Sequence, residues 1–146
     1  MAIQATLNEL QKLLYGLNYE VFLHIYQLPF VSGIAAQDYI KQALPNSEIG
    51  GTQPTSSQEL LTEVEQSLRY TGHIGSGPKP RLLNSPKFEE LLTVVLSHLE
   101  RVTSGSTEAI CFWLKSGHPA DPVFWDFAFV VVKTQNVEIF IGSSSD

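Results

Sequence analysis

The chain has 146 residues, 43% of them hydrophobic and 16% charged, with a formal net charge of -6 and a pI near 5.1. This composition is typical of an ordinary globular protein that can bury a hydrophobic core, and it predicts a single α+β domain over residues 1–146. The negative charge excludes nucleic-acid binding unless basic residues cluster locally, and the nine Lys and Arg residues are scattered.

The cysteine count and the hydropathy pattern indicate the cellular compartment in which the protein is expected. The single cysteine, Cys111, cannot form an internal disulfide, and a free thiol within a predicted strand suits a reducing compartment. The start of the sequence lacks the charged segment and apolar core of a secretory signal, and no stretch has the 18 or so apolar residues of a membrane helix. We therefore expect a cytosolic protein that does not enter a membrane.

The first half of the chain is predicted to form a helix, a strand and a second helix. Apolar residues repeat at three- and four-residue steps over about residues 3–17, which indicates an amphipathic helix. Residues 19–28 alternate, which favours a strand before Pro29, although a continuing helix is an alternative. A short helix is predicted within residues 32–44, and the Gly- and Pro-rich residues 45–57 are expected to be a surface loop.

Two further helices follow. Ser56 and Glu59 form a capping-box pattern at the start of a helix whose apolar stripe extends to Leu68. Residues 71–81 show no periodicity. Ser85 is a suitable N-cap for the next helix, whose stripe is the longest in the chain and comprises Phe88, Leu91, Leu92, Val95, Leu99 and Val102. We expect this helix to make the main core contact with the sheet.

The last third of the chain reads as three strands, residues 108–115, 122–133 and 136–141. The middle one is apolar on both faces, which predicts a central strand covered on both sides. The predicted fold class is therefore α+β. An antiparallel meander of these strands, extended by residues 19–28, packs against three or four helices. Glu138 suggests that the last strand has a more exposed face, and the serines at 143–145 are expected to fray.

Asp126 is the most suggestive polar residue, because it lies between two aromatic residues in an otherwise apolar strand. With His118 and Asp121 it could form a site at the mouth of the hairpin, where the histidine would act as a base or a metal ligand. The alternative, which we favour, is structural. Asp126 then lies near the start of the strand and either faces solvent or pairs with donors, and the other two residues merely shape the turn. Of these, we predict pairing, with hydrogen bonds from backbone amides of residues 117–121 or from Lys115.

Other chemistry has weaker signals. Lys79 and Arg81 follow several glycines and could hold an anion, but the neighbouring prolines remove amide donors, and a plain connector explains the segment better. The apolar neighbours of Cys111 would raise its thiol pKa instead of activating it. The histidines show no metal-ligand spacing, so we expect neither a metal nor a cofactor.

These observations favour a small cytosolic, non-catalytic binding or regulatory protein that acts through protein contacts. The alternative is an enzyme or small-ligand-binding protein with a pocket near His118, Asp121 and Asp126. The main support for protein contacts is an aromatic surplus on a small sheet, formed by Phe112, Trp113, Phe124, Trp125, Phe127, Phe129 and Phe140. Because such a sheet needs more cover than modest helices supply, we also expect self-association as a homodimer.

Overall fold

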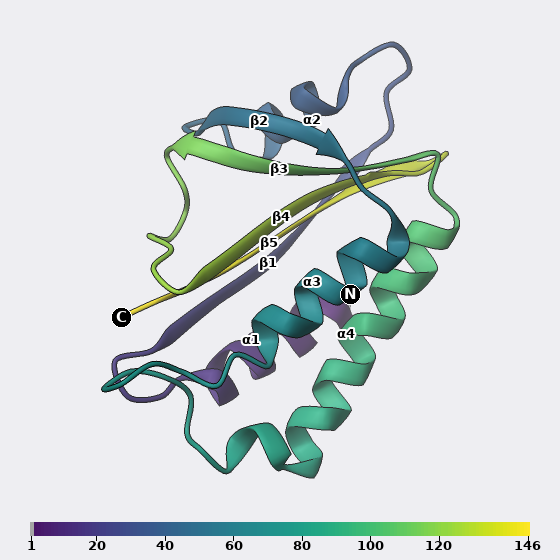
Figure 1. Cartoon of the computed structure of the whole chain (residues 1–146). Coiled ribbons are helices and arrows are strands. Elements are labelled where there is room, and N and C mark those ends of the chain that lie inside the picture. The colour runs from purple at the N-terminus through teal and green to yellow at the C-terminus, as the bar shows by residue number, and fades with distance from the viewer. Residues whose placement is uncertain (1) are drawn as a thin grey trace.

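The computed structural model describes residues 2–146, in which four α-helices surround a five-stranded antiparallel sheet (Figure 1). The elements are α1 (Ala2–Leu14), β1 (Glu20–Pro29), α2 (Ala36–Ala43), β2 (Glu48–Pro54), α3 (Ser57–Leu68), the 3-10 helix η1 (Leu82–Asn84), α4 (Pro86–Ser104), β3 (Glu108–Ser116), β4 (Trp125–Val132) and β5 (Asn136–Ser145). The strand order is β1-β5-β4-β3-β2. The predicted α+β class and the meander of the three C-terminal strands are confirmed, and the strand predicted at residues 19–28 pairs with β5.

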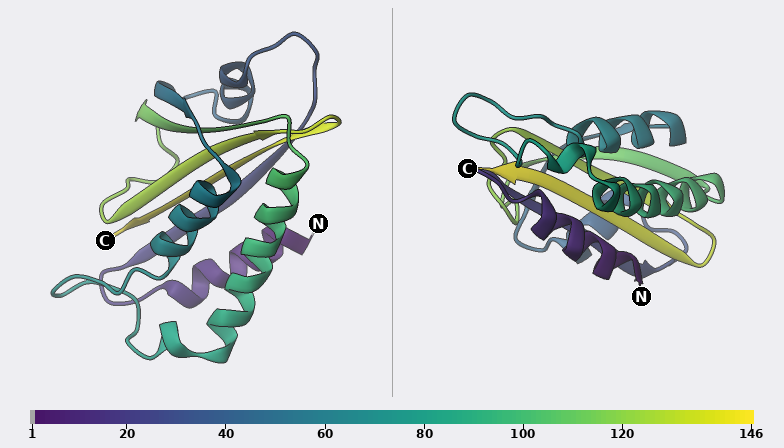
Figure 2. Two further views of the ribbon diagram at one scale, coloured as in Figure 1. Left: turned by 45° about the vertical axis from the view of Figure 1, so that its right-hand side comes forward. Right: turned by 90° about the horizontal axis from the view of Figure 1, so that it is seen from below.

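The sheet separates two hydrophobic cores. Helices α1, α3 and α4 cover one face, and the short α2 lies over the other (Figures 1 and 2). The side chains of β4 alternate between the cores: Phe127, Phe129 and Val131 enter the larger one, and Ala128, Val130 and Val132 enter the smaller one. The prediction that the middle strand is covered on both faces is therefore confirmed.

The predicted helix starts are confirmed by their caps. Ser85 Oγ accepts a hydrogen bond from the Phe88 N–H at 3.2 Å, and Ser56 Oγ accepts one from the Glu59 N–H at 3.1 Å. Helix α1 ends earlier than predicted. A turn begins after Leu14, closed by a hydrogen bond from the Gly16 N–H to the Tyr19 carbonyl at 2.9 Å, because glycine favours such a turn over a helix.

Two segments predicted to be irregular are strands. β2 lies within the expected loop at residues 45–57 and pairs with β3. Its weak sequence signal is overridden by tertiary pairing. β5 continues through the serines that were expected to fray, and Ser143 and Ser144 are each 1% exposed. They are buried because β5 lies between β1 and β4 and pairs with both along this stretch.

Glu138 was expected on an exposed face, and this expectation is wrong. The side chain lies on the three-helix side of β5, where the Oε1 atom is 2.8 Å from Nε2 of the buried His98 on α4. Gln27 Nε2 donates to the other carboxylate oxygen at 3.5 Å. Polar partners on α4 and β1 thus offset the cost of burying the carboxylate.

The outer edge of β1 is covered by side chains of α1. The Leu23 N–H donates to Gln11 Oε1 at 2.8 Å, and the Ile25 N–H donates to Gln4 Oε1 at 3.0 Å. Two backbone donors that could pair with a foreign strand are therefore occupied. No helix within residues 2–146 is long and apolar enough to cross a membrane.

Candidate functional site

The structure places His118, Asp121 and Asp126 around the connection between β3 and β4. His118 Nδ1 accepts a hydrogen bond from the Ala120 N–H at 3.0 Å, so the proton of the neutral ring belongs on Nε2. That Nε2 atom is enclosed and has no hydrogen-bond partner among the described residues. Burial lowers the pKa of His118, while the carboxylates of Asp126 and Asp121 act to raise it. The three side chains therefore lie close enough to interact electrostatically.

Asp126 itself is exposed, and the predicted structural pairing is wrong. Within residues 2–146 its carboxylate receives no hydrogen bond from the turn, and Lys115 lies instead 3.4 Å from Glu48 on β2. The prediction assumed a hairpin paired up to its turn. In the structure the β3–β4 ladder ends at Cys111 and Phe129, and the strands then diverge (Figure 1). Asp126 is therefore hydrated and needs no internal donors.

These residues do not form a metal or nucleophile site. Across residues 2–146 no group of three or more His, Cys, Asp or Glu side chains is arranged to hold a metal ion. The pKa of the half-buried Cys111 is raised by burial and further by Glu63 and Glu59, so its thiol stays protonated near neutral pH. What remains is an imidazole beside carboxylates whose Nδ1 lone pair is already engaged by the Ala120 N–H, with no activated nucleophile beside it among the described residues.

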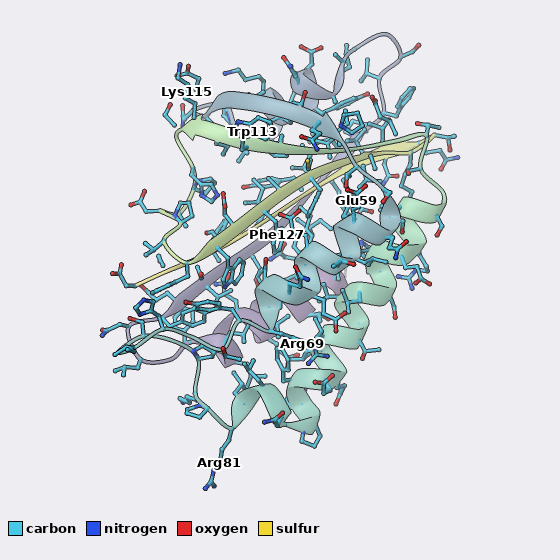
Figure 3. The ribbon with its side chains drawn as sticks, in the orientation of Figure 1. Glu59, Arg69, Arg81, Trp113, Lys115 and Phe127 are labelled. Atoms are coloured by element: carbon cyan, nitrogen blue, oxygen red, sulfur yellow. The ribbon has the colours of Figure 1, made fainter. Side chains whose placement is uncertain are left out.

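Lys79 and Arg81, the candidate anion-binding residues, do not converge. Lys79 lines a pocket of about 370 Å³ together with Arg69, whereas Arg81 points away into solvent (Figure 3). The Arg69 guanidinium is already engaged, with two hydrogen bonds to Glu89 at 2.7 and 2.8 Å and one to Glu65 at 2.8 Å. Because two carboxylates balance the two cations, the pocket has little net attraction for an anion.

Trp113 is the exposed member of the predicted aromatic surplus. The other six side chains are buried or half-buried, whereas Trp113 is 48% exposed. Its indole lies over the backbone of β2, and a Cβ on Gly51 would lie 2.2 Å from the Trp113 Cζ2 atom. A Cβ on Gly50 would lie 2.6 Å from Cδ1. The ring can occupy this position only because both residues are glycine.

Two carboxylates of α3, those of Glu63 and Glu59, lie close enough to Cys111 to act on its thiol electrostatically. Glu59 and Glu63 project from α3, which packs against β4. Burial raises the pKa of Glu63, and the carboxylate of Asp126 raises it further. Since Glu63 and Glu59 also raise the pKa of Cys111, these groups lie near one another at the divergence of β3 and β4.

A second exposed feature lies at the end of the molecule where the loop after α1 meets the loop after α3 (Figures 1 and 2). The Gly77 N–H donates to the Leu17 carbonyl at 2.9 Å, and Asn18 Nδ2 donates to the Gly75 carbonyl at 3.1 Å. Leu17 is 67% exposed and Ile74 is 96% exposed. We call residues 15–18 and 73–76 the tip.

Sequence reasoning placed residues 15–17 of the tip in the first helix, treated residues 73–76 as part of a plain connector, and assigned the β2 glycines to a surface loop. The available signal for the tip was an isoleucine inside a glycine-rich, otherwise polar segment, where no core position explains it. Nothing local indicated that Gly50 and Gly51 would lie under an indole, because Trp113 is far away in sequence.

The fold and these features define an α+β protein with an exposed apolar tip and an exposed indole on β3. Comparisons with protein-family models, with curated proteins and with solved structures found no match to the chain.

Proposed function

We propose that this chain is a small cytosolic, non-catalytic binding module that acts by contacting another protein through the tip. The observation that carries the proposal is the 96% exposure of Ile74 at the apex of a hydrogen-bonded turn. An isolated exposed apolar residue is ordinary on a protein surface. Ile74 is almost fully exposed and lies beside a second exposed apolar residue, Leu17. It therefore forms an anchor that a pocket on a partner protein can bury.

The tip is held in place before any partner binds. His73 and Ser76 exchange backbone hydrogen bonds at 2.7 and 2.9 Å, which closes a tight turn around Ile74. The two loops pack so closely that a Cβ on Gly16 would lie 2.1 Å from the Gly77 carbonyl oxygen. Because the backbone is already ordered, burying Ile74 in a partner costs little further conformational entropy.

The cytosolic location rests on Cys111, which is a free thiol in the structure.

The catalytic alternative has one observation in its favour, the unpartnered Nε2 atom of His118 beside Asp121 and Asp126. Chromogenic carboxylate and phosphate esters test it directly. Turnover that disappears in His118→Ala would favour an enzyme, and equal rates in the two proteins would remove this alternative.

The proposal is tested by capture from the native cell extract with tagged wild-type protein and an Ile74→Ser variant, with bound proteins quantified. Val94→Ser is the matched control, because Val94 is an exposed apolar residue on α4, 44% exposed and outside the tip. We expect a protein that is retained by the wild type and the control and lost with Ile74→Ser. Identical retention by all three would contradict a role for the tip.

The expected homodimer would make a second copy of this chain the protein that contacts the tip. Six of the seven aromatic residues behind that expectation are covered within one chain, so self-association now depends on the tip. Light scattering at tens of micromolar decides between the partners. A dimer that Ile74→Ser dissociates would make the partner a second copy, and a monomer would make it a different protein.

A further inference from the structure

We propose a second interaction surface, independent of the tip, at which a short extended segment of another protein adds to the sheet along the outer edge of β2. This segment places an apolar side chain against the indole of Trp113. The proposal goes beyond the tip because it rests on other residues and specifies the conformation of the partner segment.

The two edges of the sheet differ in how they are covered. At the β1 edge, Gln4 and Gln11 of α1 accept hydrogen bonds from backbone N–H groups of the strand. β2 forms the opposite edge (Figure 1). Apart from its ladder with β3, no hydrogen bond within residues 2–146 engages the backbone of residues 48–54. Unpaired backbone groups on an edge strand are a template for a further strand.

Thr52 carries the free backbone donor of this edge. The Thr55 N–H donates to the Ala109 carbonyl at 3.0 Å. Because successive residues of a strand alternate in the direction of their backbone groups, Gln53 also faces β3, whereas Thr52 and Pro54 face outward. Pro54 agrees with this phase, since proline is tolerated in a strand where the missing N–H would point away from the ladder. The outward groups are therefore the N–H and carbonyl of Thr52 and the carbonyl of Pro54.

The open stretch of β2 is short. The register with β3 shifts on both sides of Ile49, and Pro54 offers no donor at the other end. Such features restrict pairing at exposed edges, so only the residues between them can pair regularly. A partner segment of a few residues therefore fits this edge, and a long strand does not.

Trp113 gives the edge a preference for an apolar side chain. It lies opposite Gly51 in the ladder and is 48% exposed (Figure 3). The six-membered ring of the indole occupies the space over Gly51, where a Cβ would lie 2.2 Å from Cζ2. A residue of the added strand that faces Gly51 projects its side chain on the same face of the sheet, within reach of the indole. A large apolar side chain at this position would bury the exposed ring.

A second copy of β2 would fill this position poorly. On the face of the sheet that carries Trp113, β2 contributes Gly51 and Gln53, which lie opposite Trp113 and Cys111. An antiparallel second β2 would bring glycine or a polar amide against the indole. A different protein that supplies a β-branched or aromatic residue there fits the surface better.

The probe is the peptide Lys-Thr-Val-Thr-Val-Thr-Val-Thr-Lys, titrated into the whole chain. Binding is followed by tryptophan fluorescence and by NMR hydrogen exchange of the backbone amides. In the free protein we expect the Thr52 amide to exchange freely and the Gln53 amide to be protected, and the peptide should protect Thr52 as well. When the valines of the peptide face the indole, its threonine amides point at β2. N-methylation of the threonines should therefore abolish binding, and N-methylation of the valines should not.

Thr52→Pro removes the outward N–H and leaves the ladder with β3 intact. We expect it to weaken binding roughly two- to tenfold, the effect of one hydrogen bond. Thr52→Val is the matched control, because it changes the same side chain and keeps the donor. Trp113→Ala should weaken binding roughly two- to fivefold through the lost cross-strand contact. Val94→Ser, which removes an exposed apolar side chain on α4, and Ile74→Ser in the tip should bind the peptide like the wild type.

Thermal melts confirm that each variant is folded, and the methylated peptides decide the question on the wild-type chain if Thr52→Pro does not fold. Wild-type affinity in folded Thr52→Pro, or equal binding of the two methylated peptides, would overturn the proposal. A Thr52 amide that becomes protected as the protein is concentrated without peptide would make the occupant a second copy, and the assignment to another protein would then be wrong.

Discussion

Leu92→Ala tests whether α4 anchors the larger core. Leu92 is 1% exposed and faces the core that includes Phe88, Val95 and Phe129. The substitution removes roughly three carbon groups from a buried site, which costs about 2.4 kcal/mol in transfer at about 0.8 kcal/mol each. The unfilled space adds a cavity term, so the total loss of unfolding free energy should be about 3 to 4 kcal/mol.

Urea melts measure this loss as a lower midpoint with an unchanged slope. Val94→Ala on the same helix is the control, since Val94 is 44% exposed and its loss should stay within about 0.5 kcal/mol. A loss of unfolding free energy below about 0.5 kcal/mol for Leu92→Ala would mean that the apolar stripe of α4 does not make the main core contact.

Three further perturbations test other parts of the structure. Burial lowers the pKa of His118 below its ordinary 6.5, so the unfolded chain binds more protons there, and stability should fall as the pH drops below about 6.5. His118→Asn should reduce this fall in urea melts compared across that range, and parallel profiles would contradict the assignment. Glu138→Gln keeps an acceptor for His98 and Gln27, whereas Glu138→Ala removes it, so the alanine variant should be less stable by about 1 to 3 kcal/mol in the same assay. Gly51→Ala should displace the Trp113 indole, alter its fluorescence and cost about 1 kcal/mol or more, whereas Gly105→Ala, where a Cβ has room, should change neither quantity.

Predictions succeeded where a local pattern and burial agree. The stripe of α4, the caps at Ser56 and Ser85 and the two-sided apolar pattern of β4 all report on a side chain and its near neighbours. They failed where a residue or strand distant in the sequence determines the local structure or burial. β2 has little strand signal in its sequence and forms because it pairs with β3. Glu138 is buried because His98 on α4 provides a polar partner for its carboxylate.

The candidate site shows the same division. Sequence proximity correctly brought His118, Asp121 and Asp126 into one neighbourhood, because all three lie on one connection and the strand that follows it. It could not show that β3 and β4 diverge, which exposes Asp126 and uncovers Trp113. No local pattern in either strand reports on where their pairing ends.

The position of β5 in the sheet has a consequence for how the protein is made. β1 emerges early in synthesis, but its inner edge pairs with residues 136–145, roughly a hundred residues later. Until those residues arrive, α1 can cover only the outer edge of β1 through Gln4 and Gln11, and the inner edge has no partner within the sheet. A nascent or truncated chain that stops before residue 136 therefore displays an unpaired strand bearing Phe22 and Tyr26, a target for chaperones or for pairing with another unfinished copy.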